Sequence, residues 1–200
     1  MKTPFAEIIW RMDRNQIYLT FDDGPDPEVT PTLLELMHQY QISATFFVIG
    51  EKVQRHPEIV AQINQNGHTL GNHSFSHHRM LWKSKSNSLA EIARTDALLQ
   101  EITRTRPVLF RPPYGRFGWG LMRAIQTTGH KMVLWNATAR DYHSHFSSCE
   151  IQRNLTRCLR PGKIILLHDG HRNGAKTVTA LASLLAEQKI PPAQFAALPG

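Results

Sequence analysis

The chain has 200 residues, of which 41% are hydrophobic and 20% charged. This is an ordinary globular composition, and it indicates neither a disordered chain nor a membrane protein. The net charge of +7 is not gathered into a run of Lys and Arg, so we expect no nucleic-acid binding. No linker or low-complexity tract interrupts the sequence, and we expect residues 1–200 to form one domain, without an indication of oligomeric state.

The N-terminal residues carry no recognisable targeting signal. Lys2 is followed by Pro4, Glu7 and Arg11 before any apolar run reaches the length of a signal peptide. No stretch of the sequence reads as a transmembrane helix either. The sequence as it stands therefore predicts a cytoplasmic protein, or an exported one if a leader has been removed.

Short apolar runs alternate with amphipathic stretches, which is the pattern of βα units around a parallel sheet. The predicted strands are Ile17–Phe21, Ala44–Ile49, His68–Gly71, Val108–Arg111, Lys131–Asn136, Lys163–His168 and Phe195–Leu198. About seven strands with helices between them indicate an α/β fold. We expect a parallel barrel, complete or incomplete, and a flat doubly wound sheet is the alternative. No glycine-rich phosphate loop follows the first strand, which argues against a nucleotide-binding sheet.

The helices are predicted from their end signals. Thr30 followed by Pro31 indicates an N-cap and a first-turn proline. The pairs Ser88 with Glu91 and Ser147 with Glu150 match capping boxes. Further helices are expected at residues 57–67 and 177–188. Cys149 and Cys158 fall on one predicted helix, roughly 13 Å apart, so we expect two free thiols.

Residues that could bind a metal ion follow two of the predicted strands. Asp22 and Asp23 follow the first strand, although Asp-Gly-Pro is also common turn chemistry. His73 and His77 follow the third, and they share a face if that segment is helical. Two histidines and one carboxylate would form a site with open positions, as a catalytic zinc requires. His78 is a competing candidate, but its spacing from His73 points it away from that face.

Three later strands also end in polar residues. Arg111 with Tyr114, Asp141 with Tyr142, and His168 each follow a strand, and Leu166 points to the same side as His168. In a barrel or an open α/β sheet, sites form at the carboxyl ends of the strands. Each group by itself fits a structural role equally well, but five such strand ends together indicate a catalytic site.

These residues resemble the motifs of the polysaccharide deacetylase family, the carbohydrate esterases with NodB homology. The motifs occur in order over nearly the whole chain: Thr20-Phe21-Asp22-Asp23-Gly24-Pro25, His73-Ser74-Phe75-Ser76-His77, Arg111-Pro112-Pro113-Tyr114, the region around Asp141-Tyr142, and Ile165-Leu166-Leu167-His168. The resemblance implies a distorted (β/α) barrel in a single domain.

The resemblance also implies a role for each residue of the site. Asp23, His73 and His77 would bind one divalent metal ion, with zinc expected and cobalt, nickel or manganese as alternatives. Asp22 would be the general base and His168 the general acid. The remaining residues would have supporting roles: Arg111 orients Asp22, Asp141 pairs with His168, the Tyr114 N–H stabilises an oxyanion, and Tyr142 and Leu166 line the acetyl pocket.

The activity that the resemblance implies is the removal of N-acetyl groups from N-acetylglucosamine units of a glycan, of chitooligosaccharide or peptidoglycan type. An O-acetyl esterase acting on xylan is the alternative, and a catalytically dead carbohydrate-binding homologue is a third interpretation. The sequence departs from the family at the fourth motif, where Thr138 and Tyr142 stand in the places of an Asp and a Trp. The departure leaves the expected metal ligands, base and acid in place.

Overall fold

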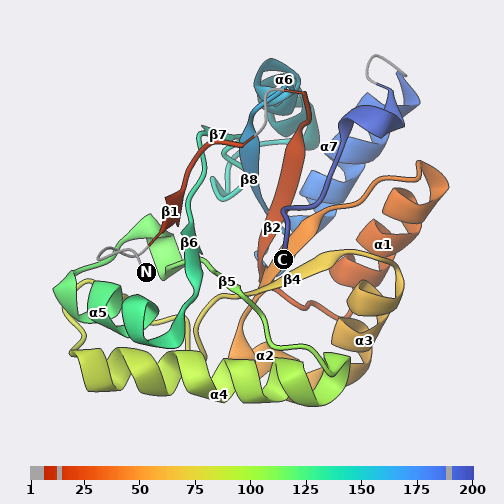
Figure 1. The fold of residues 1–200 in the computed structure, drawn as a ribbon. Helices are drawn as coiled ribbons and strands as arrows, with labels where there is room; N and C mark the ends of the chain where they lie inside the picture. The colour runs from red at the N-terminus through yellow and green to blue at the C-terminus, as the bar shows by residue number, and fades with distance from the viewer. Residues whose placement is uncertain (1–6, 13–14, 188–190) are drawn as a thin grey trace.

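The computed structural model describes residues 7–12, 15–187 and 191–200. Its strands form one eight-stranded parallel sheet in the order β1-β6-β5-β4-β3-β2-β8-β7 (Figure 1). The strands are β1 (Ile8–Ile9), β2 (Tyr18–Gly24), β3 (Thr45–Val48), β4 (Thr69–Asn72), β5 (Leu109–Phe110), β6 (Lys131–Val133), β7 (Ala137–Thr138) and β8 (Ile164–His168). The sheet curls into a half-barrel, which confirms the predicted distorted barrel over the flat alternative.

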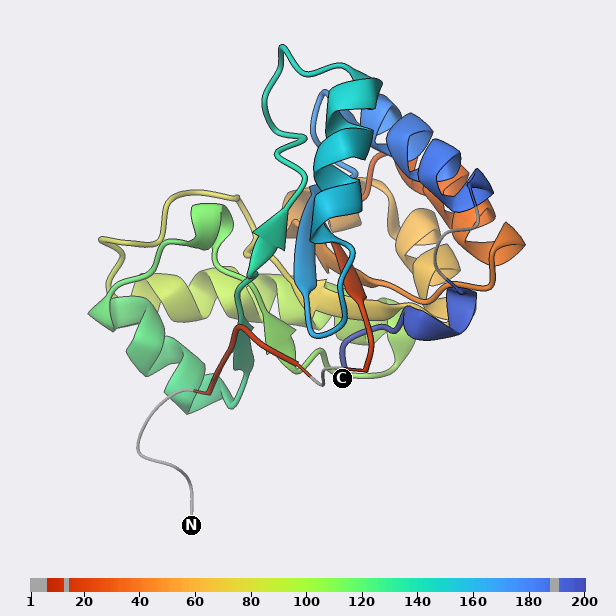
Figure 2. The same ribbon diagram turned by 90° about the horizontal axis from the view of Figure 1, so that it is seen from above.

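The helices surround the outside of the curled sheet (Figure 2). They are α1 (Val29–Gln39), α2 (Gly50–Arg55), α3 (Pro57–Gln65), α4 (Lys85–Thr103), α5 (Trp119–Thr128), α6 (Ser148–Cys158) and α7 (Gly174–Ala186), with short 3-10 turns at Pro113–Gly115 and Pro192–Gln194. Within the described ranges, none of these helices has the length and apolar character needed to cross a membrane.

Strand alternation divides the buried side chains between two layers. Leu19 and Phe21 of β2 and Leu167 of β8 belong to the large core beneath the outer helices. Tyr18 of β2 and Ile164 of β8 belong instead to a second cluster, which fills the interior at the amino ends of the strands. Because the amino end is filled with apolar groups, the carboxyl end is left for polar ones.

Six of the seven predicted strands are present, and the seventh is not a strand. In the segment predicted as Phe195–Leu198, Phe195 makes one bridge to Ile17, and the Leu198 N–H donates to Thr45 Oγ1. This segment crosses the amino ends of neighbouring strands, and Leu198 caps the interior cluster. The strands that the sequence did not indicate, β1 and β7, have two residues each, too few to show an alternation pattern.

Two helix starts were predicted wrongly. Helix α4 begins at Lys85 with Ser84 as its N-cap, so Ser88 is buried inside the helix and forms no capping box with Glu91. Helix α1 begins at Val29, and Asp26 Oδ1 accepts from the free N–H groups of Glu28 and Val29. In both cases a polar residue four positions upstream of the predicted N-cap binds backbone N–H groups at the helix start, Ser84 as the N-cap of α4 and Asp26 from the turn before α1.

Thr30 is therefore not an N-cap and has a tertiary partner. Its hydroxyl donates to the buried Asp169 at 2.6 Å. Burial raises the pKa of Asp169 to about 7. The Asp169 carboxylate leaves so little room that a Cβ on Gly24 would lie 2.3 Å from its Oδ2. Glycine is thus required at position 24, directly after the Asp22-Asp23 pair.

The other helix predictions agree with the structure where it describes them. Helix α3 begins at Pro57, and α7 begins at Gly174, three residues before the predicted start, while the predicted end at Gln188 lies outside the described residues. Cys149 and Cys158 both lie on α6 and are free thiols, as expected.

The capping box at the start of α6 gives a prediction about stability. Ser147 and Glu150 satisfy each other's backbone N–H groups. Replacing Ser147 with Ala should lower the free energy of unfolding by about 1 kcal/mol, measured by urea denaturation. The same substitution at Ser148, one residue into the helix, is the matched control. Equal effects at the two positions would contradict the capping role.

Candidate active site

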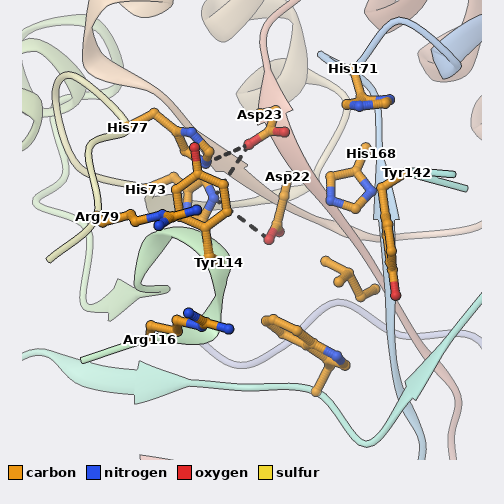
Figure 3. A pocket seen from close by; sticks show the side chains of 12 residues that line it. Asp22, Asp23, His73, His77, Arg79, Tyr114, Arg116, Tyr142, His168 and His171 are labelled. Atoms are coloured by element: carbon orange, nitrogen blue, oxygen red, sulfur yellow. Dashed lines mark ion pairs between the residues drawn. The ribbon is translucent and has the colours of Figure 1, made fainter. Parts of the chain in front are cut away.

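The polar residues predicted at five strand ends meet around one cavity of about 420 Å³ (Figure 3). Inward-facing positions of neighbouring strands supply two of them: Asp22 follows Tyr18 and Thr20 on β2, and His168 follows Ile164 and Leu166 on β8. The cavity is lined by Asp22, Asp23, His73, His77, Arg79, Tyr114, Arg116, Trp135, Tyr142, Leu166, His168 and His171. Arg111 and Asp141 stand behind this lining, and each contacts one of its members.

Arg111 holds Asp22 from beneath the cavity floor. Its Nη1 donates to Asp22 Oδ1 and to Thr20 Oγ1, both at 2.7 Å. Arg111 is fully buried, and its guanidinium lies 4.1 Å from the centroid of the Phe47 ring. Burial lowers the pKa of Arg111, and the charge of Asp22 opposes that effect. The second carboxylate oxygen, Oδ2, lies 3.7 Å from His73 Nε2, on the side of the predicted metal ligands.

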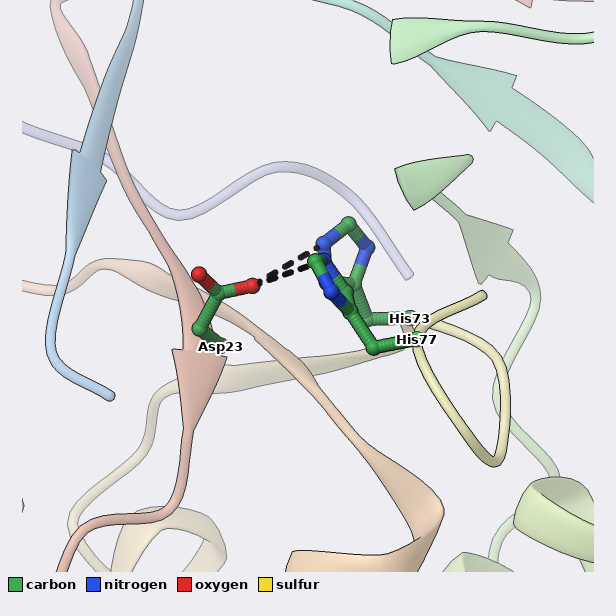
Figure 4. A group of neighbouring side chains, drawn as sticks. All are labelled: Asp23, His73 and His77. Carbon is green, nitrogen blue, oxygen red and sulfur yellow. Dashed lines mark ion pairs between the residues drawn. The ribbon is translucent and has the colours of Figure 1, made fainter. Parts of the chain in front are cut away.

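The predicted metal ligands converge in space (Figure 4). His77 Nε2 lies 3.0 Å and His73 Nε2 3.5 Å from Asp23 Oδ1, and one ligand atom from each residue lies within 4.8 Å of the others. Burial raises the pKa of Asp23, but hydrogen bonds and charge from the two histidines outweigh it, and the pKa is lowered overall. Among the described residues this is the one cluster of three such groups.

The tautomer of His73 fits a metal ligand. Its Nδ1 lies 2.7 Å from the backbone carbonyl oxygen of Arg111, which can only accept, so Nδ1 carries a proton. In the neutral ring, Nε2 then has a free lone pair directed at the carboxylate of Asp23. Two electron-rich atoms facing each other require a cation between them or a second proton on the ring. A divalent ion satisfies this requirement together with the open sides of a His2Asp set.

A tight turn brings the two histidines together. The segment from residue 73 to 77 is not helical, so a shared helix face does not bring the histidines together: β4 ends at Asn72, and Ser74 and His77 have positive φ angles of 66° and 55°. Asp23 and Tyr114 share this left-handed conformation, with φ of 73° and 60°. Non-glycine residues in this region are strained, and such strain gathers at functional sites. His78 lies outside the cluster and is exposed, with its ring beside Ser76.

Helix α4 anchors this turn through two side chains. The Glu91 carboxylate accepts from the backbone N–H groups of Phe75 and Ser76, at 3.0 and 2.9 Å, and from the Ser76 hydroxyl. Asn72 accepts from the Ser74 N–H and donates to Asp96 of α4. Burial raises the pKa of Glu91, but the Ser76 hydrogen bonds and Lys83 outweigh it and lower the pKa. The sequence pattern predicts a capping-box role for Glu91 and gives no signal for this contact.

His168 and Asp141 form a second polar pair across the cavity. Asp141 Oδ1 lies 2.9 Å from His168 Nδ1, and Oδ2 accepts from the His168 backbone N–H at 2.7 Å and from the Thr177 hydroxyl. Burial lowers the pKa of His168, but Asp141 and the charges of Asp22 and Asp23 raise it to about 9. The Tyr142 ring stands edge-on to His168, with centroids 5.8 Å apart. Thr138 lies on β7 and accepts a local hydrogen bond from the Arg140 N–H.

Four residues of the cavity wall were not predicted. Arg79 and Arg116 lie on loops two residues beyond His77 and Tyr114, Trp135 follows β6, and His171 follows β8. Burial and the positive charge of His168 lower the pKa of His171. A sequence signal existed only for Trp135, an apolar residue in inward alternation with Val133. The loops that carry the other three have no periodicity.

Comparison with known proteins gives consistent matches. The family model described as polysaccharide deacetylase matches residues 11–133. A peptidoglycan-N-acetylglucosamine deacetylase of Bacillus cereus is 37% identical over 93% of this chain and 88% of its own length. A chitooligosaccharide deacetylase of Azorhizobium caulinodans is 36% identical over 80% of this chain and 77% of its own. The crystal structure of a peptidoglycan N-acetylglucosamine deacetylase superposes with a TM-score of 0.89 at 30% identity, covering 98% of this chain and 92% of that one.

The contacts of Glu91 predict an effect on metal binding. Replacing Glu91 with Gln removes the charge that holds the turn and should weaken the affinity for zinc by about tenfold or more, as changes behind metal ligands do. The affinity would be measured by competition with a chelator. Glu101→Gln, at an exposed position of the same helix, is the matched control. Unchanged zinc affinity in Glu91→Gln would show that the turn does not need this anchor.

Proposed function

Because the chain belongs to the polysaccharide deacetylase family, we propose that it is a metal-dependent hydrolase that removes N-acetyl groups from N-acetylglucosamine units of a glycan. The products would be acetate and a free amine. One observation carries the proposal: Asp22 and His168, a base and an acid, lie in one cavity beside the Asp23–His73–His77 cluster (Figure 3). The named relatives act on peptidoglycan or chitooligosaccharides, which gives the class of glycan.

Asp23, His73 and His77 would bind the metal ion. When bound there, a divalent ion polarises the amide carbonyl and lowers the pKa of water. The ordinary choice for two imidazoles and a carboxylate is zinc, and cobalt, nickel and manganese also accept such ligands. The carbonyl of Arg111 keeps His73 in the tautomer that binds a metal through Nε2.

Asp22 would act as the general base. Arg111 occupies its Oδ1, so Oδ2 is the oxygen left to take the proton of the attacking water. The fixed ion pair also sets the direction of Oδ2, which a proton transfer requires. Asp22 and Asp23 are adjacent in sequence but would have different roles. Asp23 faces both histidines and would bind the metal ion, whereas Asp22 faces the Arg111 guanidinium and would act as the base.

His168 would act as the general acid. Its Nδ1 is held by Asp141, so Nε2 is the nitrogen free to give a proton to the departing amine. Its raised pKa keeps the ring protonated at neutral pH. In amide hydrolysis the leaving nitrogen is a poor leaving group unless it is protonated. In ester hydrolysis the alkoxide leaves more readily and depends less on a proton donor. The pair therefore supports amide hydrolysis over the alternative of an O-acetyl esterase.

The remaining lining residues would receive the acetyl group and the developing oxyanion. Leu166 faces the cavity from β8 and is buried, and Tyr142 stands beside His168, so together they would enclose a methyl group. The backbone N–H of Tyr114 is proposed as the oxyanion donor. Tyr114 lines the cavity and has a positive φ of 60°, and both observations support this role.

The activity is tested by stripping the protein with a chelator, restoring zinc or cobalt, and measuring acetate. Substrates would be N-acetylglucosamine oligomers, peptidoglycan and O-acetylated xylan. We expect metal-restored release from the N-acetylated glycans. Release from xylan alone would make the protein an esterase. Metal binding without release from any of the three would support a dead carbohydrate-binding homologue.

The assigned roles of Asp22 and His77 predict different losses. Asp22→Asn should reduce turnover by at least about a hundredfold, the lower range for a general base, while zinc stays bound. His77→Ala should lose both zinc and turnover, because one of three ligands is gone. Metal content and acetate release would be measured on the same preparations. Near-normal turnover in Asp22→Asn would refute the base assignment.

The Asp141–His168 pair predicts a shift in the pH profile. His168 has a raised pKa of about 9, so its protonated form is present below that pH and is lost above it. The alkaline limb of kcat should therefore fall as the pH rises through this range. Asp141→Asn removes the charge that raises the pKa, so the limb should move to lower pH. An unmoved limb would show that another group sets it.

A further inference from the structure

Two loops leave the cavity side by side and stay in register. Residues 77–83 follow the metal-ligand turn and residues 114–120 follow the Pro-Pro-Tyr turn; we call this pair the rim ribbon. A parallel bridge joins Met80 to Phe117. Counting back from the bridge pairs Arg79 with Arg116, which both line the cavity, and His77 with Tyr114, whose rings lie 4.8 Å apart. The ribbon therefore begins at the metal-ligand cluster.

Counting outward from the bridge pairs Trp82 with Trp119. Glycines on both sides of Trp119 allow the backbones to approach there. A Cβ on Gly118 would lie 2.1 Å from the Leu81 carbonyl oxygen, and one on Gly120 would lie 2.1 Å from that of Lys83. No side chain fits at either position, so the segments that carry the two tryptophans are in direct contact.

Both indoles lie in solvent, although the ribbon beneath them is fixed. Trp82 is 90% exposed and Trp119 83%. Met80 is fully buried in the core beneath α4 and α5, and Phe117 packs against the same cluster. Lys83 is tied to Glu91 of α4 at 3.1 Å. Two neighbouring exposed indoles on an anchored backbone mark a binding surface, because water contact with such large apolar groups is unfavourable.

The position of the indoles indicates their occupant. The ribbon is continuous with the cavity wall, where Arg79 stacks on Tyr114 with 5.6 Å between the guanidinium and the ring centroid (Figure 3). Within the described residues, Arg79 and Arg116 are in no ion pair with a carboxylate. The five residue-to-residue steps from Tyr114 to Trp119 span at most about 18 Å, which is longer than one sugar ring. A polymeric substrate that leaves the cavity along the ribbon would reach the indoles.

We propose that the rim ribbon is a subsite for the glycan chain beyond the reacting unit. Trp82 and Trp119 stack on the apolar faces of sugar rings, and Arg79 and Arg116 donate to sugar oxygens between the indoles and the cavity. The choice of a glycan as occupant rests on the proposed function. The enzyme then gains catalytic efficiency with chain length, and the reacting unit lies inside a longer chain.

The test compares short and long neutral substrates. The ratio of kcat/KM for the hexamer and the dimer of N-acetylglucosamine is measured for the zinc-loaded wild type and for a Trp82→Ala/Trp119→Ala variant. The ratio should fall by about tenfold in the variant, as the loss of two modest stacking contacts implies. Trp10→Ala, which removes a half-exposed indole outside the ribbon, is the control and should keep the wild-type ratio. An unchanged ratio in the double variant overturns the proposal.

A binding measurement separates this proposal from the proposed function. Calorimetry of the hexamer with Asp22→Asn, and with the same variant lacking both indoles, needs no turnover. Weaker binding without the indoles supports the subsite even if no glycan is deacetylated. Equal binding, together with a change of oligomeric state on removal of the indoles, identifies the ribbon as a protein contact and overturns the subsite. Thermal unfolding of each variant establishes that it is folded.

Discussion

The buried contact between Arg111 and Asp22 is the interaction on which the site depends. The guanidinium also donates to the carbonyls of Val133 and Leu134, at 3.4 and 3.3 Å, and the Arg111 carbonyl fixes His73. Arg111, directly after β5, thus joins the proposed base, a proposed metal ligand and strand β6. Removing one partner from a buried pair leaves an uncompensated charge and typically costs about 3–5 kcal/mol. Stability and catalytic geometry therefore rest on the same contact.

The curled parallel sheet brings the inward-facing residues of neighbouring strands together at one site. Every second residue of a strand points inward, and the inward residues of neighbouring strands form layers. The lowest layer contains Tyr18 and Ile164 and is apolar, and the highest contains Asp22 and His168. Asp22 and His168, the proposed base and acid, are thus the uppermost inward side chains of strands whose lower inward residues are buried. This gives the polar layer a rigid support and keeps water out from below.

The loops after the strands carry the other residues of the site. The strained turn with His73 and His77 is held by Glu91 and Asn72, which reach it from α4 and the end of β4. Beyond this turn the chain keeps its register with the Tyr114 loop until it reaches exposed side chains. The residues proposed for catalysis have buried partners. The residues proposed to contact a long glycan lie on the outer part of the same loops. A change at the outer end can therefore alter the choice of glycan without moving the metal ligands.

Sequence alone predicted the α/β barrel, six of its strands and eight of the twelve residues that line the cavity, because alternation and strand-end motifs are local patterns. It also placed Asp22, Asp23 and His168 on a common edge, which follows from parallel strands. Only the tertiary structure determined the contacts between segments that are far apart in the sequence. Glu91 anchors a turn and caps no helix, His73 and His77 meet through positive φ angles and share no helix face, and residues 195–198 close the barrel floor. The rim ribbon belongs to the same class, since its register is set by a bridge between residues far apart in the chain. Contacts of this kind depend on the packed positions of separate segments, which no short window of sequence records.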